Sequence, residues 1–133
     1  MQNLLSSITS LQLVTLAFLA ILFLQSGLDK VFNYKDNYAF FKSHFEKSIL
    51  ANTIGLLMPV ITFLEVAAGL LSAIGIVEII FNGSTRLGLI GAQLSAVAIL
   101  SLFFGQRVAK DYEGAGGLVG YFIVCMACIF LMK

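Results

Sequence analysis

The stretch IGLLMPVITFLEVAAGLLSAIGIVEII, which covers Ile54–Ile80, decides the fold of this chain. It exceeds the roughly 20 mostly apolar residues that an α-helix needs to cross the hydrocarbon core of a bilayer. Its apolar residues do not alternate with polar ones, as they would in a membrane β-strand. The stretch therefore predicts a transmembrane helix with the Glu65 carboxylate near its middle.

Three further apolar segments of similar character flank this one. The predicted spans are about residues 11–28, 54–80, 87–104 and 115–132, the last beginning in a glycine-rich turn. Small residues at four-residue steps, such as Gly69 and Ala73, allow membrane helices to approach closely. We therefore expect residues 1–133 to form a single integral membrane domain, an all-α four-helix transmembrane bundle.

The composition supports this class and excludes others. Of the 133 residues, 59% are hydrophobic and only 11% are charged, whereas soluble domains carry about 25% charged residues. This excludes an independent soluble enzyme. Lys and Arg form no run that could follow a phosphate backbone, so nucleic acid is not an expected partner. The expected surroundings are the lipid bilayer.

The connection between the first two spans is long and polar. Within it, aromatic and aliphatic residues recur at steps of three or four, the spacing of one helical face: Tyr34, Tyr38, Phe41, Phe45 and Ile49. We predict an amphipathic helix over about residues 34–52 that lies in the membrane interface with its aromatic face towards the lipid.

The distribution of positive charge predicts an orientation. The first and third connections hold six Lys or Arg residues, whereas the remaining end of the bundle holds two, Arg86 and Lys133. Short cytoplasmic loops are enriched in Lys and Arg. The first and third connections are therefore predicted to face the cytoplasm, with both termini outside.

Glu65 is the most informative single residue. It lies about 16 Å into its span at a rise of about 1.5 Å per residue, close to the bilayer midplane. A carboxylate at this depth is costly unless it is paired or protonated. Gln93 occupies a similar depth in the third span and is a natural hydrogen-bond partner. Glu65 is thus a candidate catalytic group that accepts a proton or binds a ligand, with Gln93 as a candidate cofactor-binding residue, or else it is a neutral residue that ties two helices together.

A second group of polar residues gathers at one membrane boundary. Its candidate ligand-binding members come from the end of the first span and from the third connection: Gln25, Ser26, Asp29, Lys30, Arg107 and Asp111. Two interpretations stay open. These residues bind a polar head group or the ring of a lipid-soluble cofactor, or they form a structural ion-pair network in which Lys side chains extend towards water.

The remaining candidates are cysteines and the single histidine. Cys125 and Cys128 form a CxxC in the last span, where residues three apart are neighbours; such a pair can exchange disulfides or can simply fill space. Two thiols do not complete a zinc site, and no metal is expected. His44 is expected to be solvated on the interfacial helix.

Motifs in order along the chain resemble the DoxX family of small prokaryotic membrane proteins. The first span ends in a pattern like S-G-x-x-K, here Ser26, Gly27 and Lys30. The second carries F-L-E with a glycine four residues after the acid, here Phe63–Glu65 and Gly69. A T-R pair, Thr85 and Arg86, opens the third. The resemblance covers nearly the whole chain and implies a four-helix core similar to that of vitamin K epoxide reductase.

The resemblance also implies a function and a location. It predicts a quinone-associated subunit of a redox system in the prokaryotic cytoplasmic membrane, with a quinone as the cofactor. It further implies a membrane or periplasmic protein partner. Two alternatives stay open: an accessory or assembly subunit without chemistry, and a carrier of a small solute or protons, which four helices could form only as a homo-oligomer.

Overall fold

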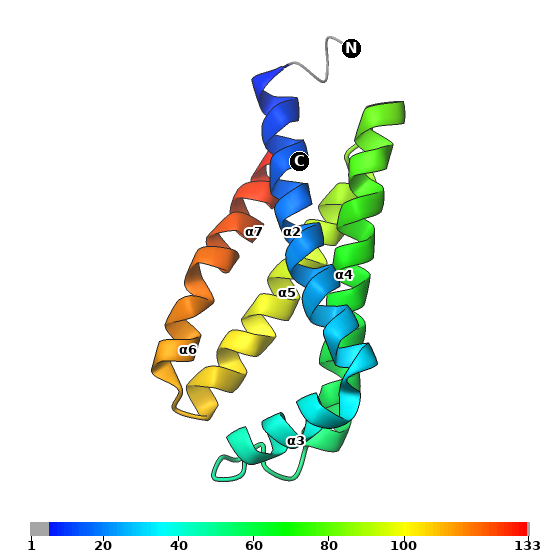
Figure 1. Cartoon of the computed structure of the whole chain (residues 1–133). Coiled ribbons are helices and arrows are strands. Elements are labelled where there is room, and N and C mark those ends of the chain that lie inside the picture. The colour runs from blue at the N-terminus through cyan, green and yellow to red at the C-terminus, as the bar shows by residue number, and fades with distance from the viewer. Residues whose placement is uncertain (1–5, 133) are drawn as a thin grey trace.

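The computed structural model describes residues 6–132, and most of them are helical. No strand occurs within this range. In chain order the helices are α2 (Ser7–Phe32), α3 (Tyr34–His44), α4 (Ile54–Asn82), α5 (Arg86–Val108), α6 (Tyr112–Gly117) and α7 (Val119–Met132). Figure 1 shows α2, α4, α5 and the α6–α7 pair along the bundle, with α3 lying across one end.

Four segments are long and apolar enough to cross a membrane: α2, α4, α5 and the continuous stretch Tyr112–Met132. The all-α four-helix bundle is confirmed, and the chain is a multi-pass membrane protein. Each helix extends a few residues beyond its predicted span, because polar residues at membrane boundaries continue the helical hydrogen bonding. The fourth span contains a break at Leu118, which follows the glycines of α6.

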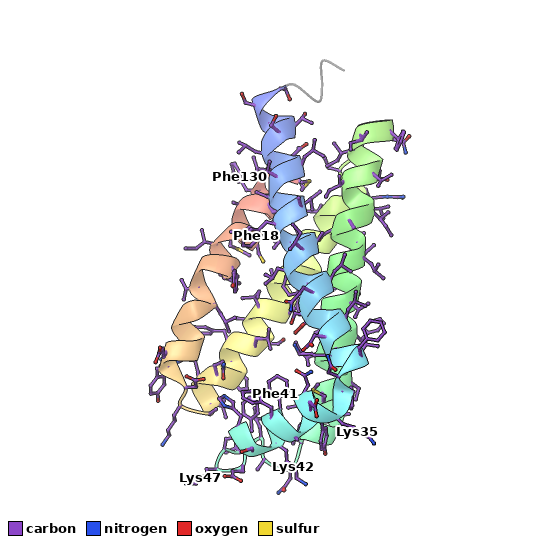
Figure 2. All side chains as sticks on the ribbon, viewed as in Figure 1. Phe18, Lys35, Phe41, Lys42, Lys47 and Phe130 are labelled. Carbon is purple, nitrogen blue, oxygen red and sulfur yellow. The ribbon has the colours of Figure 1, made fainter. Side chains whose placement is uncertain are left out.

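The outer surface of the bundle is apolar, as a lipid-facing surface must be. Large side chains such as Val14, Ile21, Phe63 and Phe130 are between 66% and 73% exposed. Figure 2 shows Phe18 and Phe130 in one half of the molecule and Lys35, Lys42 and Lys47 at the end where α3 lies. The exposed positive charges of Lys35, Lys42 and Lys47 thus gather at the α3 end of the bundle.

Close backbone contact holds α4 against α5. A Cβ atom added at Gly75 would lie 2.5 Å from the Gly88 Cα, and one added at Gly91 would lie 2.7 Å from the Ser72 amide nitrogen. Lipid offers apolar side chains an environment as favourable as a protein core, so membrane helices associate through such contacts. Small residues thus form this interface, whereas Gly69, which the sequence pattern also marked, packs against Leu24 of α2.

Hydrogen bonds close the bundle at the end opposite α3. The Gln12 side chain donates to the Leu131 carbonyl at 2.8 Å, and the Thr85 hydroxyl donates to the Met132 carbonyl at 2.8 Å. These bonds satisfy two of the carbonyls that a helix C-terminus leaves without a partner. Towards the α3 end, α6 and α7 diverge from α2 and α4 in Figure 1, and α5 runs between them.

The amphipathic helix is shorter than predicted. It ends at His44 instead of near residue 52, and turns and a bend follow as far as Asn52. Ser48 helps to end it, because its hydroxyl donates to the Phe45 carbonyl and accepts from the Leu50 amide. Such local bonds compete with helix formation. The predicted face consequently loses Ile49, which is 83% exposed.

Candidate functional site

Glu65 lies in a compact polar network between α2 and α4. Its side chain has no exposed surface, and Lys30 is only 7% exposed. The Lys30 Nζ lies 3.0 Å from the Glu65 Oε1 and 3.1 Å from Oε2. The Ser26 hydroxyl donates to Oε2 at 2.5 Å and accepts from Nζ at 3.0 Å. The carboxylate is therefore paired with a buried cation, which compensates for its removal from water.

Oε1 is the less well satisfied of the two Glu65 oxygens. It lies within ion-pair distance of Nζ but receives no well-directed hydrogen bond from any described residue, whereas Oε2 receives two. Charge attraction depends less on angle than a hydrogen bond does, so the ammonium attracts Oε1 at 3.0 Å without a well-directed hydrogen bond. Lys30 therefore neutralises both oxygens.

Glycine makes this network possible. A Cβ at Gly27 would lie 3.0 Å from the Val66 amide nitrogen, and one at Gly69 would lie 2.7 Å from the Leu24 amide nitrogen. Only glycine lets the two backbones approach so closely without a shift. The close approach brings Ser26 and Lys30 within reach of Glu65. The first two motifs quoted for the DoxX resemblance therefore meet at one α2–α4 crossing.

The expected pairing of Glu65 with Gln93 is wrong. Gln93 is exposed on the outer face of α5, whereas its neighbours Ala92 and Ser95 face inwards and are fully buried. Ser72 meets Gly91 across the α4–α5 interface, so Gln93 lies nearer to the level of Ser72 than to that of Glu65, and its side chain faces outwards. Ser26 and Lys30 take the place of Gln93 as partners of the carboxylate.

The predicted boundary cluster does not form a single site. Ser26 and Lys30 join Glu65, but Gln25 and Asp29 are exposed on α2. Asp29 accepts hydrogen bonds from the Asn33 and Asn37 side chains instead. The Arg107 guanidinium lies over the Tyr112 ring, 4.5 Å from its centroid.

Asp111 belongs to a second polar group, together with His44 and Gln106. No sequence pattern predicted that these three residues meet. Its carboxylate caps α6 by accepting from the Gly114 amide at 2.9 Å, and its Oδ2 lies 3.7 Å from the His44 Nε2. The same Nε2 lies 2.7 Å from the Gln106 Oε1. His44 was expected to be solvated, but its side chain is only 20% exposed. This group ties the end of α3 to α5 and α6.

An apolar cavity of about 760 Å³ lies beside this second group, between α3, α4 and α5. We call it the α3–α5 cavity. Ile54 and Met58 in its wall are buried, whereas Val60, Leu100 and Phe104 are half exposed, so the cavity opens sideways towards lipid. Its lining residues are Phe41, Phe45, Leu50, Ile54, Leu57, Met58, Val60, Ile61, Leu64, Leu100, Ser101, Leu102, Phe104, Gly105, Gln106 and Leu118.

Phe41 connects the cavity to the ion pair. Its ring lines the cavity, and the Lys30 Nζ lies 5.8 Å from the ring centroid. Phe45 completes the α3 side, and a Cβ at Gly105 would lie 3.4 Å from its ring. The regular spacing of Phe41 and Phe45 marked this face in the sequence. Glu65 and Lys30 themselves do not line the cavity.

The two cysteines lie elsewhere. Cys125 and Cys128 are free thiols on α7, both have no exposed surface, and they pack with Leu16 and Leu19 of α2. Among residues 6–132, no group of three or more His, Cys, Asp or Glu side chains is arranged to hold a metal ion. The cavity and the two polar groups are therefore the features that bear on function.

No protein-family model, curated protein or solved structure matches this chain.

Proposed function

We propose that this chain is a DoxX-like, quinone-associated subunit of a membrane redox system, and that the quinone binds in the α3–α5 cavity. The observation that carries the proposal is the cavity itself: apolar walls, a lateral opening between α4 and α5, and an amide at the α3 end. A ligand that enters from lipid needs an apolar body, and a polar group at one end fixes its orientation.

The residues fit a quinone in size and chemistry. Small-molecule sites commonly have volumes of about 300–1,000 Å³, and this cavity falls within that range at about 760 Å³. Phe41 and Phe45 offer aromatic faces for a ring, and Ile61 and Leu64 offer apolar surface for a tail. A bound quinone supplies reversible electron and proton transfer. The chain's own contribution is to bind and orient it and to exclude water.

Glu65 has an indirect role in this proposal. It does not line the cavity, and both of its oxygens face Lys30. Glu65 and Lys30 hold α2 against α4, and Lys30 in turn supports the Phe41 ring at the cavity wall. We therefore assign Glu65 to positioning. Gln25, Asp29, Gln93 and Arg107 are not among the residues that line the cavity.

The test compares two valines on α4. Val60 lines the cavity and Val77 does not, yet they are 50% and 51% exposed. Val60→Trp should fill the cavity, and Val77→Trp should only add bulk facing lipid. Each variant is purified gently in detergent, and extracted quinone is measured by mass spectrometry.

We expect quinone with the native chain and with Val77→Trp, and only background with Val60→Trp. Equal quinone in the two variants would overturn the proposal. The proposal would also be overturned if the native chain retained a phospholipid and added quinone did not displace it.

An accessory subunit without chemistry is the second candidate, and one observation favours it. Gly116, Gly117 and Gly120 are exposed, and a Cβ at any of them would meet nothing within 4 Å. Exposed glycines are typical of surfaces against which another membrane helix packs. If this candidate is right, Gly120→Leu abolishes co-purification of a partner subunit, while Val60→Trp leaves it intact.

The proposal includes a location. Following the resemblance and the charge distribution, we place the chain in the prokaryotic cytoplasmic membrane, with the α3 end towards the cytoplasm. The three exposed lysines at that end in Figure 2 agree with this orientation.

A further inference from the structure

A second, smaller apolar recess lies beside the α3–α5 cavity, between α5 and α7. We call it the α5–α7 groove. Its volume is about 160 Å³, and none of its six lining side chains carries an oxygen or nitrogen atom: Ile99, Leu100, Phe103, Leu118, Val119 and Phe122. These side chains offer a ligand dispersion contacts and no hydrogen bond. The groove therefore suits a hydrocarbon.

The groove continues the α3–α5 cavity, because Leu100 and Leu118 line both. On α5, Gln106 marks the α3 end of the cavity through its contact with His44, and Leu100 is the lining residue farthest from that end. From Leu118, α7 runs away from α3 in Figure 1, and Phe122 extends the groove in that direction. A chain that enters the cavity at α3 and points away from it therefore leads into the groove.

The size of the groove narrows the choice of occupant. A dry cavity of about 150 Å³ lined by Leu, Ile and Phe holds one benzene molecule, so the groove has room for on the order of six carbons. A whole helix, about 10–12 Å in diameter, is far larger than such a recess. The tail of a ligand in the adjoining cavity is already held at the mouth of the groove, and this tethering favours it over a free lipid chain.

We propose that the α5–α7 groove binds the far end of the ligand's tail, and that the chain is selective for a quinone with a long hydrocarbon tail. The inference rests on the proposed quinone function and deepens it, because it names the length class of the ligand. On the scale of one benzene in about 150 Å³, the α3–α5 cavity of about 760 Å³ holds about 30 non-hydrogen atoms. A substituted quinone ring accounts for roughly a dozen of them, so a tail longer than about 15–18 carbons passes Leu100 and Leu118 into the groove.

The test compares two quinones that share one ring and differ only in tail length: decylubiquinone and its homologue with a saturated twenty-carbon tail. Val119→Trp should fill the groove from α7, because Val119 lines the groove but not the cavity. Val97→Trp is the matched control, because Val97 lines neither and is 49% exposed against 47% for Val119. Affinity for each quinone is measured by native mass spectrometry of the full chain in detergent.

We expect Val119→Trp to weaken binding of the long homologue by about fivefold, a modest effect because lipid and detergent chains are as apolar as the groove. Decylubiquinone binding should stay unchanged, and Val97→Trp should alter neither affinity. The ratio of the two affinities is compared between variants, which cancels the unequal partition of the two quinones into micelles. Val119→Phe adds less bulk and should act in the same direction, so it serves if the tryptophan variant does not fold.

The outcomes distinguish the inference from the function on which it rests. If the Val119 variants bind both quinones as the native chain does, the tail leaves the cavity by another route or a phospholipid chain fills the groove. The inference is then wrong while the quinone function stands. If these variants weaken both quinones equally, the groove does not select for tail length and the inference is again wrong. If the native chain binds neither quinone at a saturable site, both the inference and the proposed function are wrong.

Discussion

Lys30 on α2 and Glu65 on α4 form an ion pair inside the bundle, with the Lys30 Nζ 3.0 Å from Oε1 and 3.1 Å from Oε2 of the carboxylate. Neither group reaches water to any useful extent, since the side chains are 8% and 0% exposed. Each charge therefore depends on the other, and the α2–α4 crossing depends on both.

Removing one partner should be more harmful than removing both. Glu65→Gln leaves the Lys30 ammonium buried and unpaired, and breaking a buried pair in this way costs about 3–5 kcal/mol of stability. The double change Lys30→Met with Glu65→Gln removes both charges and should recover much of that loss. Thermal unfolding in detergent, followed by circular dichroism, measures both effects. A single variant as stable as the native chain would show that the pair does not hold the helices.

Gly75 should tolerate no side chain. A Cβ there would lie 2.5 Å from the Gly88 Cα, which is backbone and cannot rotate away. Gly75→Ala should force α4 and α5 apart and cost about 1–3 kcal/mol. Gly116→Ala is the control, because its Cβ would meet open space and alanine favours helix by about 1 kcal/mol. The melting temperatures should move in opposite directions, and a matching shift for the two variants would refute the assigned contact.

Cys125 and Cys128 should be chemically silent in the folded protein. Both are fully buried among α2 side chains, and access limits thiol reactions. N-ethylmaleimide should modify neither in detergent but both after denaturation, as counted by intact mass. The double variant Cys125→Ala, Cys128→Ala should still retain quinone on purification. Rapid labelling of the native chain, or loss of quinone in a double variant that still folds, would restore the redox interpretation of the CxxC.

Orientation is testable with single cysteines in the Cys125→Ala, Cys128→Ala background. Ser43→Cys lies at the α3 end and Asn82→Cys at the opposite end, and both native residues are exposed. In sealed cells, a membrane-impermeant maleimide should label Asn82→Cys and spare Ser43→Cys, because the proposed orientation puts the lysine-rich end in the cytoplasm. The reverse pattern would invert the proposed topology.

The four spans could be predicted from the sequence because length and apolar content determine whether a helix can cross a bilayer. The aromatic face of α3 was visible for a similar reason, since Phe41 and Phe45 repeat at helical spacing. The end of α3 was placed too late, because a spacing rule does not register the side-chain bonds by which Ser48 competes with the helix.

The partner of Glu65 could not be predicted from depth alone. The α4–α5 contacts put Gln93 nearer to the level of Ser72 than to that of Glu65. Residues on a helix also differ in direction by about 100° per position, and Gln93 is exposed on the outer face of α5. Lys30 was assigned to the boundary because it follows the predicted span 11–28, yet a long side chain can reach inwards from there. The His44–Gln106 contact joins residues 62 apart in the chain. It depends on how α3 folds back, which no local pattern encodes.

The order of Lys30 and Glu65 along the chain has a consequence for biogenesis. A ribosome releases α2 before α4, so the cation is already at the membrane when the carboxylate leaves the translocon. Glu65 can therefore exchange water for Lys30 and Ser26 on entering the hydrocarbon, and need not cross alone at the cost of several kcal/mol. A rearranged chain in which α4 precedes α2 would lose that help during insertion, even if its final bundle were identical.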